Sequence, residues 1–350
     1  MRFILFLMLF TLSFVYAQEN KVYSLTLASS WGEQIPFLGS APHRVAHLAE
    51  TMSAGRLKIR VDFPQKHKAP LSIMDMVKEG LYDIGYTTSV YYKGKDYKLV
   101  FFMTIPFGMT TTEQYAWYYF GGGRELSEKV YTPYGLMAYP GGSVGISMGG
   151  WFKKEILSLN DLKGLKIRIA GQGGDVMAKL GVNAMSTSPG ELYMAMETGL
   201  IDAVEWIAPA FDMAMGFHKV APYYYTGWSK PSGEGQYLVN KKKLDSLPED
   251  LKLILESAFK ITARELLDES NHANAQTWQK IKSDYPFIKV NHFPKEVMLA
   301  LKNAAHAVEE EQAAKDILYK EILESQRAYI AKIRPWSMMG EFNYLKEVEK

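Results

Sequence analysis

The sequence contains no cysteine, and this absence limits the chemistry open to the protein. A disulfide framework, a thiolate metal site, a cysteine nucleophile and a lipid anchor on cysteine are all excluded. An excess of charge of one sign is also missing, because 40 lysine and arginine residues accompany 38 aspartate and glutamate residues. No basic cluster is interleaved with aromatic residues, so we expect no nucleic-acid partner.

Long apolar runs are confined to the start of the sequence. Residues 1–17 have the form of a secretory signal, in which Arg2 precedes the apolar run Ile4 to Phe10. Val15 and Ala17 occupy the small-residue positions before the expected cleavage. The apolar run is shorter than the roughly 20 residues that a membrane-spanning helix needs. We therefore expect an exported protein in the periplasm.

Strand-like and helical patterns alternate between Tyr23 and Thr87, and a second alternating set begins near Leu136. This rhythm predicts largely parallel sheets with helices on both faces. About 330 mature residues exceed what one hydrophobic core organises, so two lobes are expected. The predicted boundaries are 18–143 for lobe 1, completed by part of 229–270, and 144–228 for lobe 2.

The last third of the sequence is predicted to be helical. Residues 248–284 form one long amphipathic pattern with Pro248 at its first turn. At 1.5 Å a residue such a helix extends roughly 50 Å, so it braces both lobes, kinks or reaches a partner. A further amphipathic helix is expected from Lys295 to Ile333, within a C-terminal helical region at 295–350.

The segment LKIRI places Arg168 inside an apolar strand. An arginine there is costly to desolvate unless an anion meets it, and its guanidinium can hold a carboxylate through two parallel hydrogen bonds. The anion is either a ligand from solution or a carboxylate of the scaffold. The candidates for a scaffold partner are Asp83, Asp175 and Asp202.

Glu205 and Trp206 follow an apolar run that ends at Val204. A carboxylate at the carboxyl end of a strand lies where open α/β sheets bind ligands. The Glu205 carboxylate and the Trp206 carbonyl oxygen are oxygen ligands that suit sodium or calcium. The alternative is a buried glutamate that is hydrogen-bonded inside its own lobe.

Gly145, Ser147 and Gly149 match the G-x-S-x-G elbow of serine hydrolases. That motif needs a strand, a tight turn and a helix, whereas residues 145–151 are predicted to continue as a strand. A serine hydrolase that uses Ser147 is therefore a remote alternative.

Two other patterns have simple explanations. His43 and His47 have a zinc-compatible spacing but lack the glutamate of the catalytic motif, so we assign them to a solvated helix surface. The loop from Gly171 to Gly174 lacks the full spacing of a phosphate-binding loop and is assigned to a tight turn.

The mature sequence resembles the solute-binding receptors of tripartite ATP-independent periplasmic (TRAP) transporters, of the DctP type, along essentially its whole length. Within that family it is most similar to the 2-oxoacid receptor branch. The resemblance is carried, in order, by GRLKIRV (55–61), YYKGKD (91–96), IPFGMTTTEQYAW (105–117), MGGWFKKEI (148–156), DLKGLKIRIAG (161–171), GLIDAVEWIAP (199–209) and GFHKVAPYYYTGW (216–228).

The resemblance implies a two-lobed clamshell of the periplasmic-binding-protein kind, with a small organic acid in the cleft. By motif, Arg168 grips the ligand carboxylate. Glu205 and the Trp206 backbone hold a sodium or calcium ion that also touches the 2-oxo or 2-hydroxy oxygen of the ligand. Gln236, in GEGQYLVN, matches the position of a further metal oxygen. No organic cofactor and no enzymatic step are implied.

Tyr91, Tyr92, Ser143 and Ser147 are the other site positions that the resemblance implies. Tyr91 and Tyr92 close the cleft from the first lobe. The branch commonly carries a glycine-asparagine-threonine run and a glutamine before MGGW, where this sequence has Ser143, Val144 and Ser147. The shorter side chains remove one ligand contact and one metal oxygen.

The implied partners are TRAP permease subunits in the membrane and a small organic acid. The alternatives are a different acid, such as a sulfonate, a dicarboxylate or an aromatic carboxylate, and a ligand sensor for a membrane kinase. In some relatives the long helix exchanges between two copies, so a homodimer is the alternative to a monomer.

Overall fold

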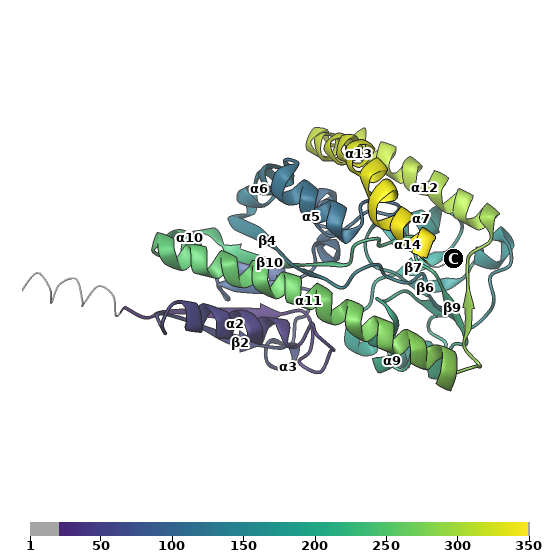
Figure 1. Cartoon of the computed structure of the whole chain (residues 1–350), viewed down its shortest axis with the longest axis horizontal. Coiled ribbons are helices and arrows are strands. Elements are labelled where there is room, and N and C mark those ends of the chain that lie inside the picture. Colours follow the sequence, from purple (N-terminus) through teal and green to yellow (C-terminus); the bar gives the residue numbers. More distant parts are fainter. Residues whose placement is uncertain (1–20, 349–350) are drawn as a thin grey trace, which may run out of the picture.

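A computed structural model of the chain describes residues 21–348 (Figure 1). The signal predicted at residues 1–17 lies outside them. Within the described part, no helix has both the length and the apolar character needed to cross a membrane.

The first lobe is built on a five-stranded sheet of order β2-β1-β3-β10-β4. β1 is parallel to β2 and β3, whereas β10 is antiparallel to β3 and β4. The elements of this part are β1 (Tyr23–Ser29), α2 (Ala41–Met52), β2 (Leu57–Asp62), α3 (Pro64–His67), α4 (Ile73–Lys78), β3 (Ile84–Thr87), α5 (Thr111–Phe120), α6 (Gly123–Tyr131), β4 (Leu136–Ser143) and β10 (Glu234–Asn240).

The second lobe is built on a six-stranded sheet of order β11-β9-β5-β8-β6-β7. β6 is parallel to β7 and β8, which makes this corner a small doubly wound sheet. Its elements are β5 (Gly150–Phe152), β6 (Lys166–Arg168), α7 (Gln172–Lys179), β7 (Asn183–Met185), α8 (Leu192–Glu197), β8 (Ala203–Val204), α9 (Pro209–Ala214), β9 (Tyr223–Tyr225) and β11 (Lys289–Asn291).

Short helical turns connect these elements. They are η1 (Ser89–Tyr92), η2 (Tyr97–Phe102), η3 (Thr132–Tyr134), η4 (Leu159–Leu162), η5 (Pro189–Glu191), η6 (Phe217–Lys219) and the π-turn η7 (Met338–Phe342).

Two short segments cross between the lobes, residues 144–149 from β4 to β5 and residues 226–233 from β9 to β10, and the chain crosses a third time between β10 and β11. The two short segments lie against each other, because the Val144 amide donates to the Gly233 carbonyl at 3.0 Å and the Ser147 amide donates to the Lys230 carbonyl at 3.0 Å. The strand predicted over residues 145–151 is wrong in its first part, since the strand spans Gly150–Phe152. Gly145 has φ of 81°, which is incompatible with regular strand backbone.

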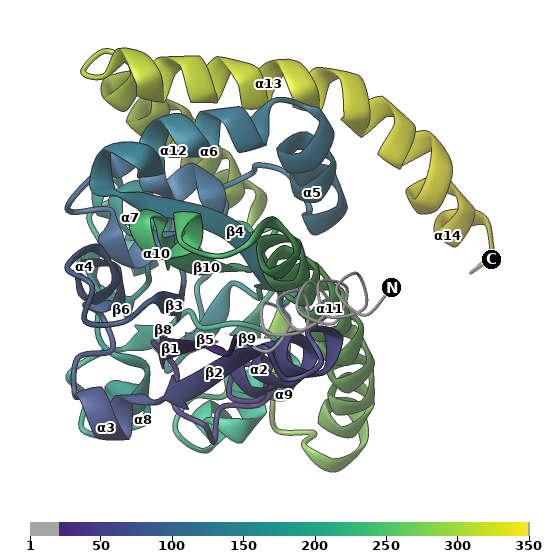
Figure 2. The same ribbon diagram turned by 90° about the vertical axis from the view of Figure 1, so that its left-hand side faces the viewer.

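Long helices flank both lobes (Figures 1 and 2). α11 packs on α2 and β4 of the first lobe and on α9 of the second, so it braces both, as one of the sequence alternatives required. Exchange of this helix between two copies stays a prediction. These elements are α10 (Lys241–Asp245), α11 (Glu249–Asp284), α12 (Lys295–Ala313), α13 (Ile317–Ser337) and α14 (Asn343–Val348).

The single helix predicted from Lys295 to Ile333 is wrong. α12 ends at Ala313 and α13 begins at Ile317, and the two pack side by side. Asp316 causes the break, because its backbone is extended and its carboxylate accepts the Tyr319 amide as a helix cap at 2.9 Å.

Candidate functional site

The central predicted residues meet at the carboxyl ends of two neighbouring strands. Arg168 ends β6 and pairs in register with Val204 of the parallel strand β8, which Glu205 and Trp206 follow. The Glu205 amide donates to the Arg168 carbonyl at 2.9 Å. Parallel strands therefore bring together side chains that are 37 positions apart in the sequence.

Arg168 is a buried cation with unused donors. Its side chain is 1% exposed, and Nη1 donates to the Glu205 carbonyl oxygen at 3.0 Å. The guanidinium carbon lies 5.1 Å from the centroid of the Trp206 ring, a cation–π contact. Across residues 21–348, Nε and Nη2 find no hydrogen-bond partner. Burying two such donors costs free energy that an incoming anion recovers.

The scaffold carboxylates proposed as alternative partners of Arg168 have other contacts. Asp83 accepts the Thr26 amide at 2.8 Å, Asp175 forms an ion pair with Lys93 at 2.7 Å, and Asp202 accepts the Lys166 amide at 3.0 Å. The observed geometry leaves the free edge of the Arg168 guanidinium for another anion.

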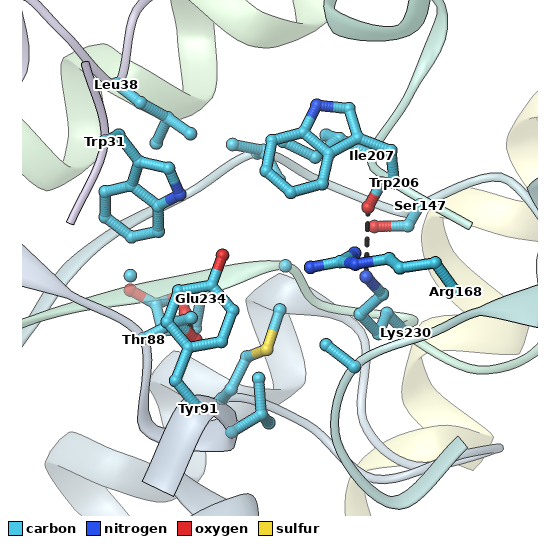
Figure 3. A pocket seen from close by; sticks show the side chains of 16 residues that line it. Trp31, Leu38, Thr88, Tyr91, Ser147, Arg168, Trp206, Ile207, Lys230 and Glu234 are labelled. Carbon is cyan, nitrogen blue, oxygen red and sulfur yellow. Dashed lines mark hydrogen bonds between the residues drawn. The ribbon is translucent and has the colours of Figure 1, made fainter. Parts of the chain in front are cut away.

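Arg168 lines a small cavity of about 40 Å³ between the lobes (Figure 3). This is roughly three times the volume that a single water requires, so the space suits a molecule of few atoms. Both lobes and both crossing segments contribute walls. The lining residues are Trp31, Leu38, Thr88, Val90, Tyr91, Met103, Val144, Ser147, Arg168, Ala170, Trp206, Ile207, Lys230, Gly233, Glu234 and Gly235.

Only one of the two predicted tyrosines belongs to this lining. Tyr91 lines the cavity opposite Arg168 and packs 6.4 Å from Trp31 between ring centroids. Burial raises the pKa of Tyr91, while the positive charge of Arg168 opposes that shift. Tyr92 points into the first lobe, where its hydroxyl pairs with Thr87 Oγ1 at 2.8 Å. The two side chains diverge because they are consecutive residues of η1.

The two predicted serines also separate. Ser147 lines the cavity and is 1% exposed. Ser143 ends β4 behind the lining, where its hydroxyl pairs with Thr111 Oγ1 at 2.8 Å and accepts the Gly145 amide at 3.1 Å. Ser143 thus shapes the start of the crossing segment.

Lys230 is a site residue that the sequence analysis missed. Its side chain is 7% exposed, and Nζ forms an ion pair with Glu205 Oε2 at 2.7 Å. The same Nζ donates to the Trp206 carbonyl oxygen at 3.0 Å (Figure 3). Burial lowers the pKa of Lys230, and the Glu205 carboxylate opposes that change. The visible signal was a lysine in the Gly/Ser/Pro-rich crossover around Trp228 to Gly235.

Gln236, predicted to supply a metal oxygen, lies away from the cavity lining. Its Oε1 accepts the Tyr131 hydroxyl at 2.7 Å inside the first lobe. The cause is a register shift between Gly235 and Gln236 where β10 pairs with β4, because a bulge breaks the alternation of faces. In the part of the chain that the structure describes, no group of three histidine or acidic residues is placed to hold a metal.

Glu234 is a second buried carboxyl group in the lining. Its Oε1 accepts the Tyr115 hydroxyl and the Gly142 amide, each at 3.0 Å. Oε2 has no hydrogen-bond partner within residues 21–348. Burial raises the pKa of Glu234 to about 8, against the lowering effect of these hydrogen bonds. Because this pKa lies above 7, Glu234 is mostly uncharged at neutral pH.

Thermal stability should fall as pH rises because two buried acids have raised pKa values. Burial raises the pKa of Glu234 from 4.5 to about 8 and that of Asp212 from 3.8 to about 7. Each folded value exceeds the unfolded one, so the stability they contribute is complete below about pH 4 and is lost through about pH 7 to 8. We expect a higher melting temperature at about pH 6 than at about pH 9.

The Glu234→Gln variant should flatten this pH dependence, whereas Glu249→Gln, at a side chain that is 89% exposed, should leave it unchanged. A melting temperature that rises over the same interval would contradict the assignment.

The dismissed motifs remain outside any catalytic arrangement. Gly149 is followed by β5 and no helix, so Ser147 does not sit on a hydrolase elbow. No histidine belongs to the described cavity lining. His43 and His47 are exposed on α2, and His43 contacts Glu33 at 2.9 Å. The Gly171 turn leads directly into α7.

Comparison with known proteins decides the family. The model of the bacterial extracellular solute-binding protein, family 7 (DctP), matches residues 27–316. The chain belongs to this family. Solute-binding receptors of the DctP type are what the sequence resemblance predicted, and their two-lobed α/β fold is confirmed.

Similar solved structures cover nearly the whole chain. A TRAP periplasmic solute-binding protein from Pseudoalteromonas atlantica, with bound sodium and pyruvate, is 47% identical with a TM-score of 0.92, covering 93% of this chain and 99% of its own. One from Colwellia psychrerythraea, with bound calcium and pyruvate, is 48% identical with a TM-score of 0.92, covering 93% and 100%. Both ions are those that the resemblance implied for the family.

A further similar protein is known by its sequence. The monocarboxylate 2-oxoacid-binding periplasmic protein of Nostoc sp. is 36% identical over 321 residues, which are 91% of this chain and 87% of that protein.

Proposed function

We propose that this family 7 protein is the periplasmic receptor of a TRAP transporter and binds a small 2-oxo or 2-hydroxy monocarboxylate such as pyruvate. The observation that carries the proposal is the buried Arg168 guanidinium, whose Nε and Nη2 face the cavity without a partner among the described residues. A carboxylate accepts two parallel hydrogen bonds from that edge. The pyruvate-bound relatives support the choice of ligand.

The charges around the cavity favour a monoanion. Arg168 and Lys230 carry two positive charges, Glu205 carries one negative charge, and Glu234 is mostly neutral because its pKa is about 8. The sum is one positive charge, which a monocarboxylate neutralises. A dicarboxylate would leave a second buried negative charge without a partner, and that is costly.

The size and polarity of the cavity favour a short acid. A volume of about 40 Å³, roughly three times what a single water requires, suits a short acid better than a long one. Trp31, Leu38 and Ile207 line it with apolar surface, which suits the methyl group of pyruvate. Larger aromatic or sulfonated acids require the lobes to stay further apart.

Binding couples to closure of the lobes. Arg168 comes from the second lobe and Tyr91 from the first, and the two side chains line the same cavity between the lobes. A ligand therefore enters an open state and is enclosed as the crossing segments at 144–149 and 226–233 bend. Because the acid satisfies Arg168 best in the closed state, it shifts the equilibrium toward closure. The permease then recognises the closed shape, and no covalent step is needed.

Calorimetric titration tests the proposal. The protein is unfolded, dialysed and refolded to remove retained ligand, and is then titrated with pyruvate, lactate, succinate and benzoate. We expect pyruvate or lactate to bind one site per chain at least about 10-fold more tightly than the other two acids. Equal or tighter binding of succinate or benzoate would reject the monocarboxylate assignment.

A further inference from the structure

We propose that in this chain the ammonium of Lys230 takes the place of the metal ion, so that the receptor binds its acid without sodium or calcium. This inference rests on the proposed function, since it concerns the 2-oxo or 2-hydroxy oxygen of the same ligand. The observation behind it is the position of one nitrogen atom. Nζ of Lys230 lies 2.7 Å from Glu205 Oε2 and 3.0 Å from the Trp206 carbonyl oxygen. These are the two oxygens that the family resemblance assigns to the metal.

A metal ion and this ammonium compete for one position. Calcium binds oxygens at about 2.3–2.6 Å, so an ion held by both oxygens would lie within a few ångströms of Nζ. Two positive charges at that separation in a buried site repel strongly. Glu205 is 0% exposed and provides a single negative charge, which Lys230 already balances. The residues present therefore fit a lysine at this point better than a metal.

The other side chains expected to supply oxygen ligands to a metal either point away from this corner or are too short to reach it. Gln236 is hydrogen-bonded to Tyr131, and Ser147 offers a single hydroxyl oxygen on a short side chain. Glu234 lies on the Tyr91 side of the cavity, whereas Lys230 lies on the Arg168 side (Figure 3). Calcium prefers about six to eight oxygen ligands, and this arrangement offers far fewer around the Glu205–Trp206 corner.

Lys230 can make the contact with the ligand oxygen that the family resemblance assigns to the metal. An ammonium has three donors, and within residues 21–348 Nζ of Lys230 uses two of them, toward Glu205 and the Trp206 carbonyl oxygen. The third donor is available for the 2-oxo or 2-hydroxy oxygen of a ligand whose carboxylate is held by Arg168. Both side chains line the same cavity. The backbone hydrogen bond from Ser147 to the Lys230 carbonyl, 3.0 Å long, fixes Lys230 on the crossing segment.

The test compares pyruvate binding by refolded, chelator-dialysed protein in a sodium-free Tris buffer with EDTA, with sodium chloride and with calcium chloride. We expect affinities that agree within about twofold in all three buffers. An affinity that falls at least about 10-fold without a metal would overturn the inference while leaving the proposed function standing. Absence of pyruvate binding in every buffer would instead reject the proposed function.

Calcium binding without any acid separates the two hypotheses, because it does not use the ligand. We expect calcium titration of the wild type to show no site at the Glu205–Trp206 corner. The Lys230→Gln variant exposes those oxygens and adds an amide oxygen, so it should gain calcium binding, and its pyruvate affinity should become calcium-dependent by about 10-fold or more. Lys241→Gln, at an exposed lysine paired with Asp245, is the matched control and should behave as wild type.

Two results of these titrations with calcium and with pyruvate would overturn the inference. One is calcium uptake by the wild type that Glu205→Gln abolishes. The other is a folded Lys230→Gln protein whose pyruvate affinity equals that of the wild type in EDTA. Melting curves establish that the variant is folded, and the wild-type comparison stands even if it is not.

Discussion

Replacing Arg168 by methionine should reduce pyruvate affinity by at least about 30-fold, because removal of one partner of a buried, hydrogen-bonded charge pair costs about 2–5 kcal/mol. Methionine fills the volume of the side chain without its charge or donors. The carboxylate of the ligand would then be buried against Trp206 with no cation at its oxygens. Titration calorimetry on the refolded variant measures the loss.

The same substitution should not weaken the ligand-free fold, and this sets Arg168 apart from an ordinary structural arginine. Nε and Nη2 have no hydrogen-bond partner within residues 21–348, so the empty protein carries their desolvation cost uncompensated. We expect the ligand-free Arg168→Met protein to melt at or above the wild-type temperature. Arg264→Met, at a side chain that is 73% exposed on α11, is the control for both measurements. Retained pyruvate affinity in Arg168→Met, or a fold that collapses without ligand, would contradict the carboxylate-clamp interpretation.

Replacing Glu205 by leucine should lower the free energy of unfolding by about 3–5 kcal/mol, the range found when one partner of a buried ion pair is removed. Glu205 is 0% exposed and balances Lys230 through the 2.7 Å contact, with Arg168 close by. Its loss leaves two buried cations with no carboxylate between them. Urea unfolding of the ligand-free proteins gives the difference.

A double-mutant cycle assigns the Glu205 effect to Lys230. Replacing Lys230 by methionine in the Glu205→Leu background removes the stranded charge and should recover more than about half of the lost stability. Asp245→Asn, which breaks the exposed ion pair with Lys241, should change the free energy of unfolding by less than about 1 kcal/mol. Effects of Glu205 and Lys230 that simply add would show that the two side chains are not coupled.

The part of the site that could be predicted from sequence is the part that depends on strand ends. Arg168, Glu205 and Trp206 each lie at the end of a short apolar strand, and neighbouring parallel strands place such ends together. That rule alone predicts that these residues lie close together, without information on other contacts between distant residues. The Ser147 position was also found, although the strand expected around it is a crossing loop.

The rest of the site depends on contacts that sequence patterns do not encode. Lys230 and Glu234 come from the crossing segment and the strand after it, where composition indicates a loop but not the direction of a side chain. Gln236 was misplaced because the bulge beside Gly235 reverses the face of β10. Tyr92 was included with Tyr91 although consecutive residues of a tight turn point in different directions.

The fold, like the site, was predicted where local sequence patterns decide the structure and was missed where other contacts decide it. The long periodic helix predicted at residues 248–284 is α11, and its bounds agree with that range to within one residue. The break between α12 and α13 was not predicted, because a single capping aspartate, Asp316, outweighs an otherwise helical pattern. β11 joins the second sheet from beyond α11, a pairing between distant segments that the periodicity of either segment does not reveal.

The most direct test of the account is a crystal structure of the refolded, chelator-dialysed protein with pyruvate. We expect the pyruvate carboxylate to lie against Nε and Nη2 of Arg168, inside the cavity lined by Tyr91 and Trp206. We also expect Nζ of Lys230 to keep its contacts with Glu205 and the Trp206 carbonyl and to face the 2-oxo oxygen. Pyruvate bound away from Arg168 would contradict the central claim of a carboxylate clamp.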